Sequence, residues 1–378
     1  MSWPMVKLGK VCKLVNGDRG TNYPSKDSIL SSGIPFINAG NLTEGHSIVC
    51  SGANFISEER YDLLSNGKVQ YGDILFCLRG SLGKFAVVDS SVPKGAIASS
   101  LVIIRPDKSI CEDYLKNYLR STLCAREISR FGNGAAQPNL SAKDLREFEI
   151  PLPPLPEQKR IAAILDKADA IRRKRQQAIQ LVDDFLHAVF LDMFGDPVTN
   201  PKGWEVKPLG HLVVNKDGKR VPIKASDRTD MAGEYPYYGA SGVIDYVNDF
   251  IFEGQHLLIG EDGANLLARS TPIAFIADGR YWVNNHAHVL GVKNGFSLDY
   301  LAFSINMRGL ESFVSGSAQP KLNQENLNKI PIQVPPLGLV DKFSAVLKKH
   351  QAYMGKMSIA ESEDLFSSLS QRAFSGQL

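Results

Sequence analysis

The chain has 378 residues, of which 43% are hydrophobic and 22% charged, a composition typical of a folded protein with about two or three domains. A formal net charge of only +3 neither requires nor excludes a polyanionic partner, because a local basic face can form on a nearly neutral chain. No apolar run approaches the roughly 18 residues of a membrane span, and the start MSWPMVKLGK lacks the apolar core of a signal peptide, so we expect a cytoplasmic protein.

The first globule is expected over residues 1–154. Short apolar runs broken by turn residues favour strands, namely IPFIN, DILFCL, KFAVVD and SLVIIRP. One helix is predicted over about residues 112–131. This mixture predicts an α+β domain with a mixed, twisted sheet. All five cysteines lie in this globule, in an odd number and without a C-x-x-C pair, so we predict neither a disulfide framework nor a zinc site.

A proline hinge and a long helix follow. The hinge PLPPLP begins at Pro151, and Pro156 suits the first turn of a helix that Gly195 and Pro197 would end. About 39 residues make a helix of roughly 58 Å. Its apolar residues recur at spacings of three and four, which predicts a coiled-coil seam broken at Arg175. The seam residues are Ile161, Ile164, Ala168, Ile171, Ala178, Val182, Phe185 and Val189.

The second half repeats this order. Residues 197–336 contain the strand-like runs HLLIG, TPIAFIA, YWVNN and HVLGVK, and a helix is predicted near residues 298–314. A second hinge leads into a second long helix over residues 337–378, with a seam that runs from Phe343 to Leu369. Its start, PPLGLVDKF, is less regular than PPLPEQKRI in the first half, so the beginning of this helix is less well defined.

The two halves share a repeat. Residues matched 182 positions apart include Gln137-Pro138 with Gln319-Pro320, and Pro153-Pro154-Leu155 with Pro335-Pro336-Leu337. The segments before the hinges match more faintly, for example Trp3 with Trp204 and Gly72 with Gly254. Similar helices with dissimilar globules predict two domains that recognise different ligands on a common helical scaffold. Because both halves carry them, Gln137 and Gln319 are assigned to structure near the hinge.

The long helices need a partner for their seams. Pairing within the chain, as two antiparallel helices related by a pseudo-twofold axis, is favoured by the repeat, and a homodimeric coiled coil is the alternative. The basic run RRKR at Arg172–Arg175 fits a solvated helix face, or else a contact with phosphate or a partner protein.

Catalytic signatures are lacking. GSLGKF at Gly80 departs from a phosphate loop, and GNGAAQ at Gly132 departs from a dinucleotide fingerprint. TNPKGW at Thr199 has no aromatic residue after Asn200-Pro201 to stack a flipped base. His286 and His288 alternate on an expected strand, which disfavours a metal site. We therefore predict no catalytic, cofactor-binding or metal-binding residue. We expect a protein that recognises a ligand without chemistry of its own, or a scaffold.

The repeated hinge and helix resemble a known family. PLPPLPEQKRIAAIL after AQPNLS, FLHAVFLDMFGDP and the second QPKL…VPPL are similar to the specificity subunit of type I restriction–modification systems, over essentially the whole chain. The resemblance implies target-recognition domains over residues 1–154 and 197–336 and spacer helices over residues 155–196 and 337–378. Each domain would read half of a split double-stranded DNA target, and a rigid spacer would hold the half-sites about one helical turn apart.

The resemblance also implies the partners. Two methyltransferase subunits and the motor-nuclease subunits would dock on this chain, and S-adenosylmethionine, ATP and Mg²⁺ would belong to them. Adenine methylation, translocation and cleavage would then lie outside this chain. The alternatives are a protein-interaction scaffold with two ligand-binding globules on a coiled coil, and a chain that methylates or cuts DNA by itself.

Candidate DNA contacts are polar loop residues that the family motif does not mark. Arg, Lys and Asn side chains can bond base edges or phosphates. In the first domain the candidates are Arg19, Lys26, Asn38, Arg79 and Lys84. In the second domain they are Lys219, Arg220, Lys224, Arg228, Arg269 and Asn285.

Overall fold

The computed structural model describes residues 3–132, 139–293, 295–316, 319–356 and 359–378. The chain divides into two compact units, Met1–Gln176 with Ser358–Leu378 (unit 1) and Gln177–Met357 (unit 2). The long helix α6 (Leu155–Phe194) begins in unit 1 and ends in unit 2. Within the described ranges, no helix is long and apolar enough to cross a membrane. Gln137 of the sequence repeat lies outside the described residues, and Gln319 is exposed.

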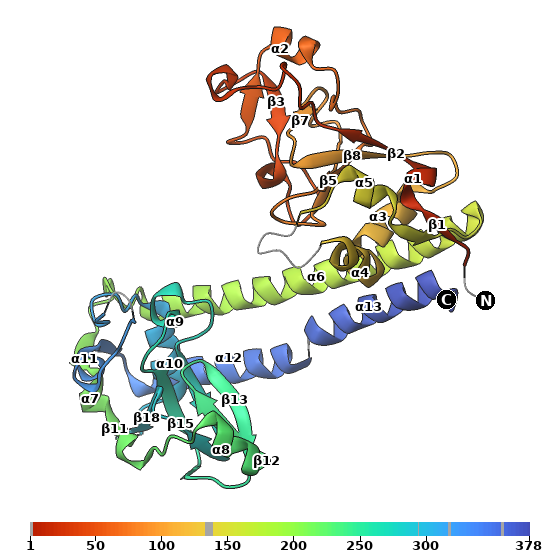
Figure 1. Ribbon diagram of the computed structural model, residues 1–378. Coiled ribbons are helices and arrows are strands. Elements are labelled where there is room, and N and C mark those ends of the chain that lie inside the picture. The colour runs from red at the N-terminus through yellow and green to blue at the C-terminus, as the bar shows by residue number, and fades with distance from the viewer. Residues whose placement is uncertain (1–2, 133–138, 294, 317–318, 357–358) are drawn as a thin grey trace. The chain divides into compact units, whose positions relative to one another are not determined.

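The described residues of unit 1 form three sheets, and Figure 1 shows the strands β2, β8 and β5 of the largest. The largest has four antiparallel strands in the order β2-β8-β5-β6, and its strands are Cys12–Asn16, Leu101–Pro106, Ile74–Cys77 and Phe85–Val87. The second has the order β4-β3-β7, with β3 and β7 parallel, and its strands are Asn54–Ile56, Ile34–Ile37 and Ala96–Ile97. The third pairs β1 (Met5–Lys7) with β9 (Glu149–Pro151) just before the hinge.

Unit 2 repeats this plan with its own sheets. The antiparallel sheet has the order β11-β18-β15-β16, and its strands are Val213–Asn215, Ala287–Val292, His256–Gly260 and Ala274–Ala277. The mixed sheet has the order β13-β12-β17-β14, and its strands are Gly242–Val247, Ala232–Gly239, Arg280–Val283 and Phe252–Glu253. β10 (Glu205–Pro208) pairs with β19 (Pro331–Val334) before the second hinge. The predicted α+β class with mixed sheets is confirmed in both halves.

The shorter helices surround these sheets. Those of unit 1 are α1 (Leu8–Val11), α2 (Glu58–Leu63), α3 (Glu112–Arg120), α4 (Thr122–Phe131), α5 (Ala142–Arg146), and the 3-10 turns η1 (Lys26–Ser28) and η2 (Ala39–Asn41). Those of unit 2 are α7 (Leu209–Leu212), α8 (Ala225–Asp230), α9 (Asn265–Ala268), α10 (Leu298–Met307), α11 (Gln324–Lys329) and η3 (Asp217–Lys219). Where one helix was expected over residues 112–131, Ser121 ends α3 and caps α4 by accepting a hydrogen bond from Cys124 N–H. α10 also ends earlier than predicted.

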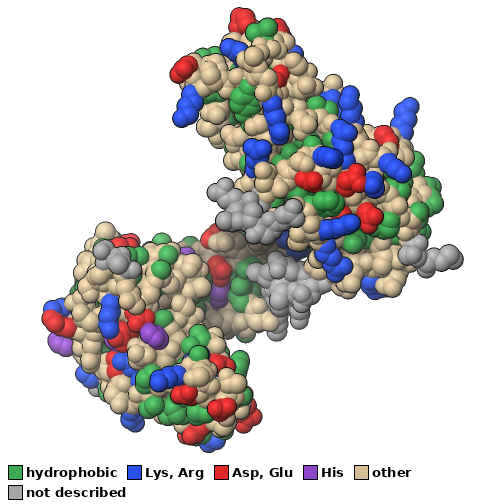
Figure 2. Space-filling view, in the orientation of Figure 1, with side chains coloured by type: hydrophobic (Ala, Val, Ile, Leu, Met, Phe, Trp, Pro, Cys, Tyr) green, Lys and Arg blue, Asp and Glu red, His purple; other side chains and the backbone are tan. Residues whose placement is uncertain are grey.

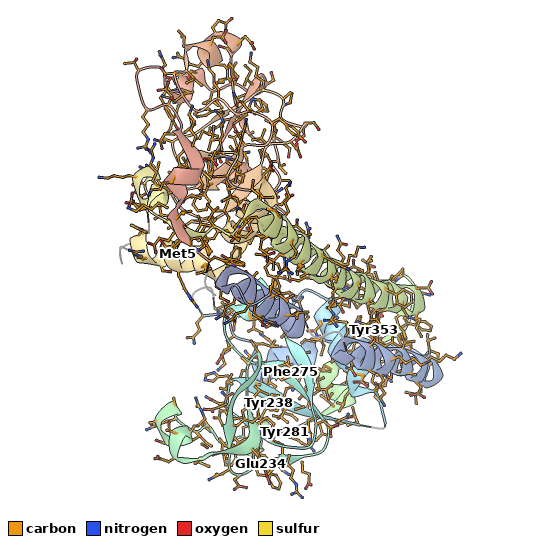
Figure 3. All side chains as sticks on the ribbon, turned by 90° about the vertical axis from the view of Figure 1, so that its right-hand side faces the viewer. Met5, Glu234, Tyr238, Phe275, Tyr281 and Tyr353 are labelled. Atoms are coloured by element: carbon orange, nitrogen blue, oxygen red, sulfur yellow. The ribbon has the colours of Figure 1, made fainter. Side chains whose placement is uncertain are left out.

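Three aromatic residues pack together where the two larger sheets of unit 2 meet. Tyr238 of β12 packs against Phe275 of β16 with ring centroids 6.0 Å apart and against Tyr281 of β17 at 5.5 Å (Figure 3). Because β12 and β17 lie in one sheet and β16 in the other, Tyr238 links the two. The buried residues around it form a core of their own in this unit.

Helix α6 has the expected ends. It covers 40 residues. Gly195 follows it with φ +77°, a left-handed conformation that favours glycine, and donates its N–H to Leu191 O. At the start, the buried Gln158 accepts from Cys111 N–H at 2.7 Å and donates to Pro153 O at 2.8 Å, which ties the helix to the hinge. The corresponding residue of the second half is the buried Val340.

The predicted seam of α6 is partly wrong. Ile171 is 56% exposed and Phe185 63% exposed, whereas Leu165, Leu186 and Phe190 are buried. The reason is that each end of α6 buries the stripe facing its own globule, so one constant heptad seam does not run along the helix.

The second half has two helices in the region where one was expected, α12 (Leu337–Lys356) in unit 2 and α13 (Ile359–Ser375) in unit 1. In unit 2, Asp183 contacts His350 at 2.9 Å, and seven residues further along α6 the ring of Phe190 lies 5.3 Å from that of Phe343. Because higher residue numbers on α6 meet lower residue numbers on α12, the two helices are antiparallel. In unit 1, Phe374 of α13 joins the core that holds the start of α6.

Candidate nucleic-acid interface

Each hinge is fixed to its globule by a buried tyrosine. Tyr114 of α3 donates its hydroxyl to Pro151 O at 2.7 Å, and Tyr300 of α10 donates to Gln333 O at 3.1 Å. Pro151 and Gln333 are 182 residues apart, the offset of the repeat. The same donor therefore holds the same carbonyl at the base of both globules.

A tryptophan at the start of each globule holds a helix end. Trp3 Nε1 donates to Ala373 O at 2.9 Å, near the end of α13. Trp204 Nε1 donates to Phe194 O at 2.9 Å, at the end of α6. Each globule thus contacts the beginning of one helix and the end of another, α6 and α13 in unit 1 and α12 and α6 in unit 2, which explains why the faint WPMVKLG and WEVKPLG match persists.

Both globules also present one strand end in the same way. Leu140 N–H donates to Leu78 O at 3.0 Å in unit 1, and Leu322 N–H donates to Glu261 O at 2.8 Å in unit 2. The next residue forms an isolated β-bridge in each case, Arg79 with Asn139 and Asp262 with Lys321. Arg79 and Asp262 therefore occupy equivalent positions after β5 and β15.

In unit 1 this position lies in a basic cleft. Arg19, Tyr23, Arg79 and Ser99 line a cavity of about 250 Å³. Arg79 is exposed, and its Nε donates to Asn139 Oδ1 at 3.2 Å, which orients the guanidinium group. The cleft brings together two predicted DNA contacts that are 60 residues apart in the chain.

The loop before Arg19 is fixed by Asp18. This buried carboxylate accepts from the N–H groups of Gly20 and Ser65, both at 2.8 Å. The Gly20 hydrogen bond, followed by that of Ser65, lowers the pKa of Asp18. Arg19 is itself exposed and, among the described residues, forms no ion pair.

The other predicted DNA contacts of unit 1 differ in whether their side chains already have a partner within the protein. Lys26 is exposed and has no acidic partner within the described ranges. Asn38 accepts from Gly40 N–H at 2.8 Å in the capping box of η2, so its amide oxygen serves the fold. Lys84 lies 3.3 Å from the exposed Glu44. Figure 2 shows that Lys and Arg side chains are spread over the visible face of unit 1 and mixed with acidic ones.

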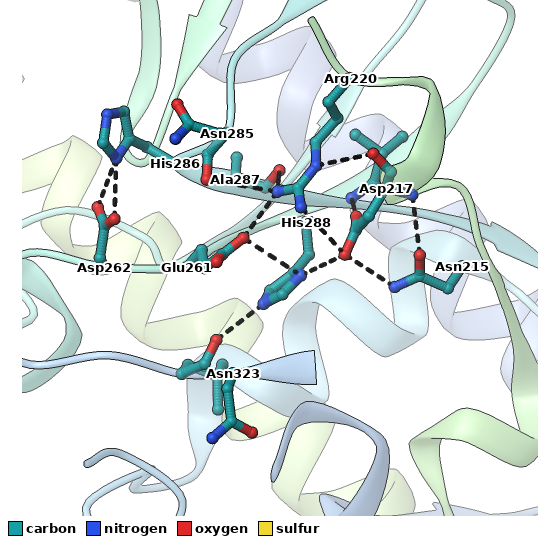
Figure 4. Close-up of polar contacts among 12 residues, drawn as sticks. Asn215, Asp217, Arg220, Glu261, Asp262, Asn285, His286, Ala287, His288 and Asn323 are labelled. Carbon is teal, nitrogen blue, oxygen red and sulfur yellow. Dashed lines mark hydrogen bonds and ion pairs between the residues drawn. The ribbon is translucent and has the colours of Figure 1, made fainter. Parts of the chain in front are cut away.

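In unit 2 the equivalent strand end carries a buried polar network (Figure 4). Arg220 Nη1 donates to Glu261 Oε2 at 2.7 Å and to Ala287 O at 2.8 Å. His288 is 1% exposed, with Nδ1 2.6 Å from Asp217 Oδ2 and Nε2 2.8 Å from Leu322 O. The guanidinium of Arg220 is therefore enclosed by the protein and has few N–H groups left to donate to a DNA base.

Opposing effects act on the carboxylates of this network. Burial alone would raise the pKa of Asp217, but the hydrogen bond and charge of His288 lower it below its ordinary value. Burial likewise opposes ionisation of Glu261, but the hydrogen bond from Arg220, the charges of His288 and Arg220 and the hydrogen bond from Lys321 together lower this pKa as well. The network is thus satisfied with both carboxylates ionised.

The exposed rim of the network is different in chemistry. His286 Nδ1 lies 2.8 Å from Asp262 Oδ2 and 2.9 Å from Oδ1. Asn285 is exposed, and the side chain of Lys321 is 53% exposed and lies 3.2 Å from Glu261. The sequence interpretation missed Asp262. Aligning LRG at Leu78 with EDG at Glu261 would have placed Asp262 opposite Arg79.

The remaining candidates of unit 2 separate into free and engaged side chains. Lys219 and Lys224 are exposed, without an ion pair among the described residues. Arg228 Nε donates to Asp245 Oδ2 at 2.8 Å, and its guanidinium lies 5.0 Å from the centroid of the Tyr237 ring. Arg269 has φ +51° and donates to the carbonyls of Arg308 and Ile305. Both arginines hold local structure.

The basic run on α6 also has partners inside the chain. Arg172 Nη2 donates to Asp169 Oδ1 at 2.9 Å, and Arg173 Nε lies 3.2 Å from Oδ2 of the same residue. Asp169 is only 3% exposed, and Arg120 approaches it at 3.4 Å. Two of the four cations of RRKR therefore neutralise a buried carboxylate in unit 1.

Comparisons with known proteins agree with this duplicated architecture. Residues 2–181 and 201–352 each match the family of type I restriction modification DNA specificity domains. A protein named as a type I restriction enzyme specificity subunit from Haemophilus influenzae is 34% identical over 143 residues, which is 38% of this chain and 36% of that protein. Another from Methanocaldococcus jannaschii is 21% identical over 384 residues, 92% of this chain and 86% of that one.

A solved structure has the same fold. The S subunit of a type I restriction–modification system from M. genitalium superposes with a TM-score of 0.60 at 17% identity, covering 99% of this chain and 96% of that one. The resemblance stated from the hinge and helix motifs is thereby confirmed. The chain belongs to the family of type I restriction modification DNA specificity domains and carries that domain once in each half.

Proposed function

We propose that this chain is the DNA-reading subunit of a type I restriction–modification complex and that each unit reads one half of a split target. The observation that supports this most is the repeated frame. The same tyrosine, tryptophan and strand-end hydrogen bonds occur in both units, and the exposed side chains on that frame differ. The same set of backbone-holding hydrogen bonds with two different exposed surfaces suits two domains that recognise different DNA sequences.

The free cations and amides are the proposed DNA contacts. Arg19 and Arg79 line one cleft in unit 1, and Lys219, Lys224 and Asn285 are exposed in unit 2. Lysines on mobile stems suit phosphates, which position the protein, whereas Arg and Asn also fit base edges. We assign Asn38, Arg220, Arg228 and Arg269 to holding loops in place, because each already uses side-chain polar atoms in hydrogen bonds within the protein.

The chemistry is proposed to belong to partner subunits. Two methyltransferase subunits with S-adenosylmethionine would modify adenine, and motor-nuclease subunits with ATP and Mg²⁺ would translocate and cut DNA in the cytoplasm. In this proposal the chain alone neither methylates nor cleaves. Linking two readers raises the effective concentration of the second once the first is bound, so neither half-site needs high affinity alone.

The test is a methylome. A host that lacks other DNA methylation would express the chain with its methyltransferase partner, and modified adenines would be mapped by sequencing. We expect one motif made of two specified parts separated by a gap of fixed length. A single uninterrupted motif would contradict the proposal.

Salt dependence separates this proposal from a protein-interaction scaffold. Binding through phosphates releases counterions, so affinity for duplex DNA should fall steeply between about 50 and 200 mM salt. An affinity that is independent of salt would favour the scaffold.

A further inference from the structure

We infer that Asp262, together with His286, is a base-reading position of unit 2 that accepts a hydrogen bond from an exocyclic amino group of DNA. The inference rests on the proposed function and names the chemistry of one of its contacts. It concerns a carboxylate, a group that a search for cations overlooks.

The first argument is positional. Asp262 follows β15 as Arg79 follows β5, and both residues form the same isolated bridge to the segment after the Gln-Pro repeat. The preceding carbonyl accepts an N–H from a leucine of that segment in both units. Arg79 lies exposed in the basic cleft of unit 1. If that cleft faces DNA, the equivalent backbone position of unit 2 faces it too.

The second argument is the chemistry of the pair. His286 Nδ1 faces both oxygens of Asp262, which places a donated proton on Nδ1, and in the tautomer that carries its single proton there Nε2 is an acceptor. The side chain of His286 is 49% exposed and that of Asp262 19%. The groups left for a ligand are thus a carboxylate oxygen and a ring nitrogen, both acceptors. In the major groove, the donors that match them are N4 of cytosine and N6 of adenine.

The third argument excludes a contact between Asp262 and the phosphate backbone of DNA. Phosphate oxygens are anionic acceptors, so a carboxylate cannot serve as a phosphate contact. Lys321 and Asn285 beside the pair can supply donors to a phosphate, whereas Asp262 cannot. An acidic side chain on a DNA-facing surface is compatible with binding when it meets an amino group.

The fourth argument concerns stability. The adjacent network of Asp217, Arg220, Glu261 and His288 is closed without Asp262. A hydrogen-bonded pair at a rim, with a histidine side chain that is 49% exposed, contributes little to folding. Within the described part of the chain, no group of three or more His, Cys, Asp or Glu is arranged to hold a metal ion. Stability and metal binding therefore give no account of the pair.

The experiment uses the full chain in complex with its methyltransferase partner and a pool of duplexes randomised in both half-sites. Asp262→Asn keeps the shape but replaces one acceptor by a donor amide. We expect discrimination at a single base pair of one half-site to fall about 5- to 150-fold, with every other position unchanged. The base at that position in the wild-type motif, cytosine or adenine, identifies the amino group.

Three further variants complete the design. Arg79→Lys keeps the charge and loses the two-pronged donor, so it should relax one position in the other half-site. His286→Gln should relax the same position as Asp262→Asn. Glu253→Gln is the matched control, an exposed carboxylate of unit 2 paired with Arg280 at 3.0 Å, and should leave the motif unchanged. Unchanged melting temperatures verify folding.

The outcomes separate the two proposals. A wild-type motif without a gap overturns the proposed function. A split wild-type motif that Asp262→Asn and His286→Gln leave unchanged, or weaken equally at all positions, overturns the inference alone. Relaxation of one amino-bearing base in the half-site opposite to that of Arg79 supports it.

Discussion

Unit 1 and unit 2 place different residues at the same strand end. The carbonyl that accepts the leucine N–H belongs to the buried, apolar Leu78 in unit 1 and to Glu261 in unit 2. Glu261 requires Arg220 and His288 around it, whereas Leu78 needs only apolar neighbours. The difference shows that the backbone frame is independent of the side chains it carries, so surface and even core chemistry can change while the hinge and helices stay the same.

The largest expected effect comes from breaking the buried polar network of unit 2. Asp217→Ala removes the carboxylate that lies 2.6 Å from the buried His288 and 3.5 Å from Arg220 and leaves Glu261 as the carboxylate facing both, which should lower the free energy of unfolding of unit 2 by about 3–5 kcal/mol. Denaturant unfolding followed by circular dichroism measures it. The control Glu253→Ala removes an exposed ion pair and should cost less than about 1 kcal/mol. Equal losses for both variants would contradict the assigned role of the network.

A smaller, matched effect is expected at the shared tyrosines. Tyr114→Phe and Tyr300→Phe each remove the hydroxyl that donates to a hinge carbonyl, and each should cost about 1–3 kcal/mol. Tyr71→Phe, at a side chain that is 82% exposed, is the neutral control. A large loss in one unit and none in the other would show that the two hinges are held differently.

Acid should affect unit 2 through the same network. The folded-state pKa values of Asp217 and Glu261 are lowered, so their stabilisation is fully present above the ordinary carboxylate pKa of about 4 and is lost as pH falls through the lower folded values. Unfolding midpoints between pH 6 and 3 should therefore drop less in Asp217→Asn than in the wild type, starting from a lower value. Parallel curves would count against the network as the cause.

The smallest effects are expected at exposed lysines. Lys26→Ala in unit 1 and Lys219→Ala in unit 2 should weaken DNA binding uniformly across sequences and reduce the salt slope by about one. The base preference of both half-sites should stay as it was. A change in motif would move either lysine from phosphate contact to base reading.

The long-range order of the fold followed from local signals. Pro156 and Gly195 marked the ends of α6 because proline and glycine restrict the backbone wherever they occur. Two matched hinges predicted two units. The break at Ser121 was not predicted, because serine is compatible with a helix interior and with a cap, and only the surrounding packing decides.

The candidate site was less predictable for the same physical reason. Arg19 and Arg220 look equivalent as loop arginines, yet one is exposed and the other is enclosed by Asp217 and Glu261. Glu261 and the carbonyl of Ala287, which lie 41 and 67 residues from Arg220 in the chain, help decide that this cation is not free. A second comparison of the two halves, centred on the strand ends, would have found Asp262 from the sequence.

The most direct test of the account is a graft of one reader onto both positions. Residues 204–333 would be replaced by residues 3–151, so that Trp3 takes the place of Trp204, and Tyr114 and Pro151 those of Tyr300 and Gln333, in the full chain expressed with its methyltransferase partner. The account predicts a split methylation motif in which both parts carry the sequence read by unit 1. A folded chimera that still recognises the original second part would contradict the assignment of one half-site to each unit.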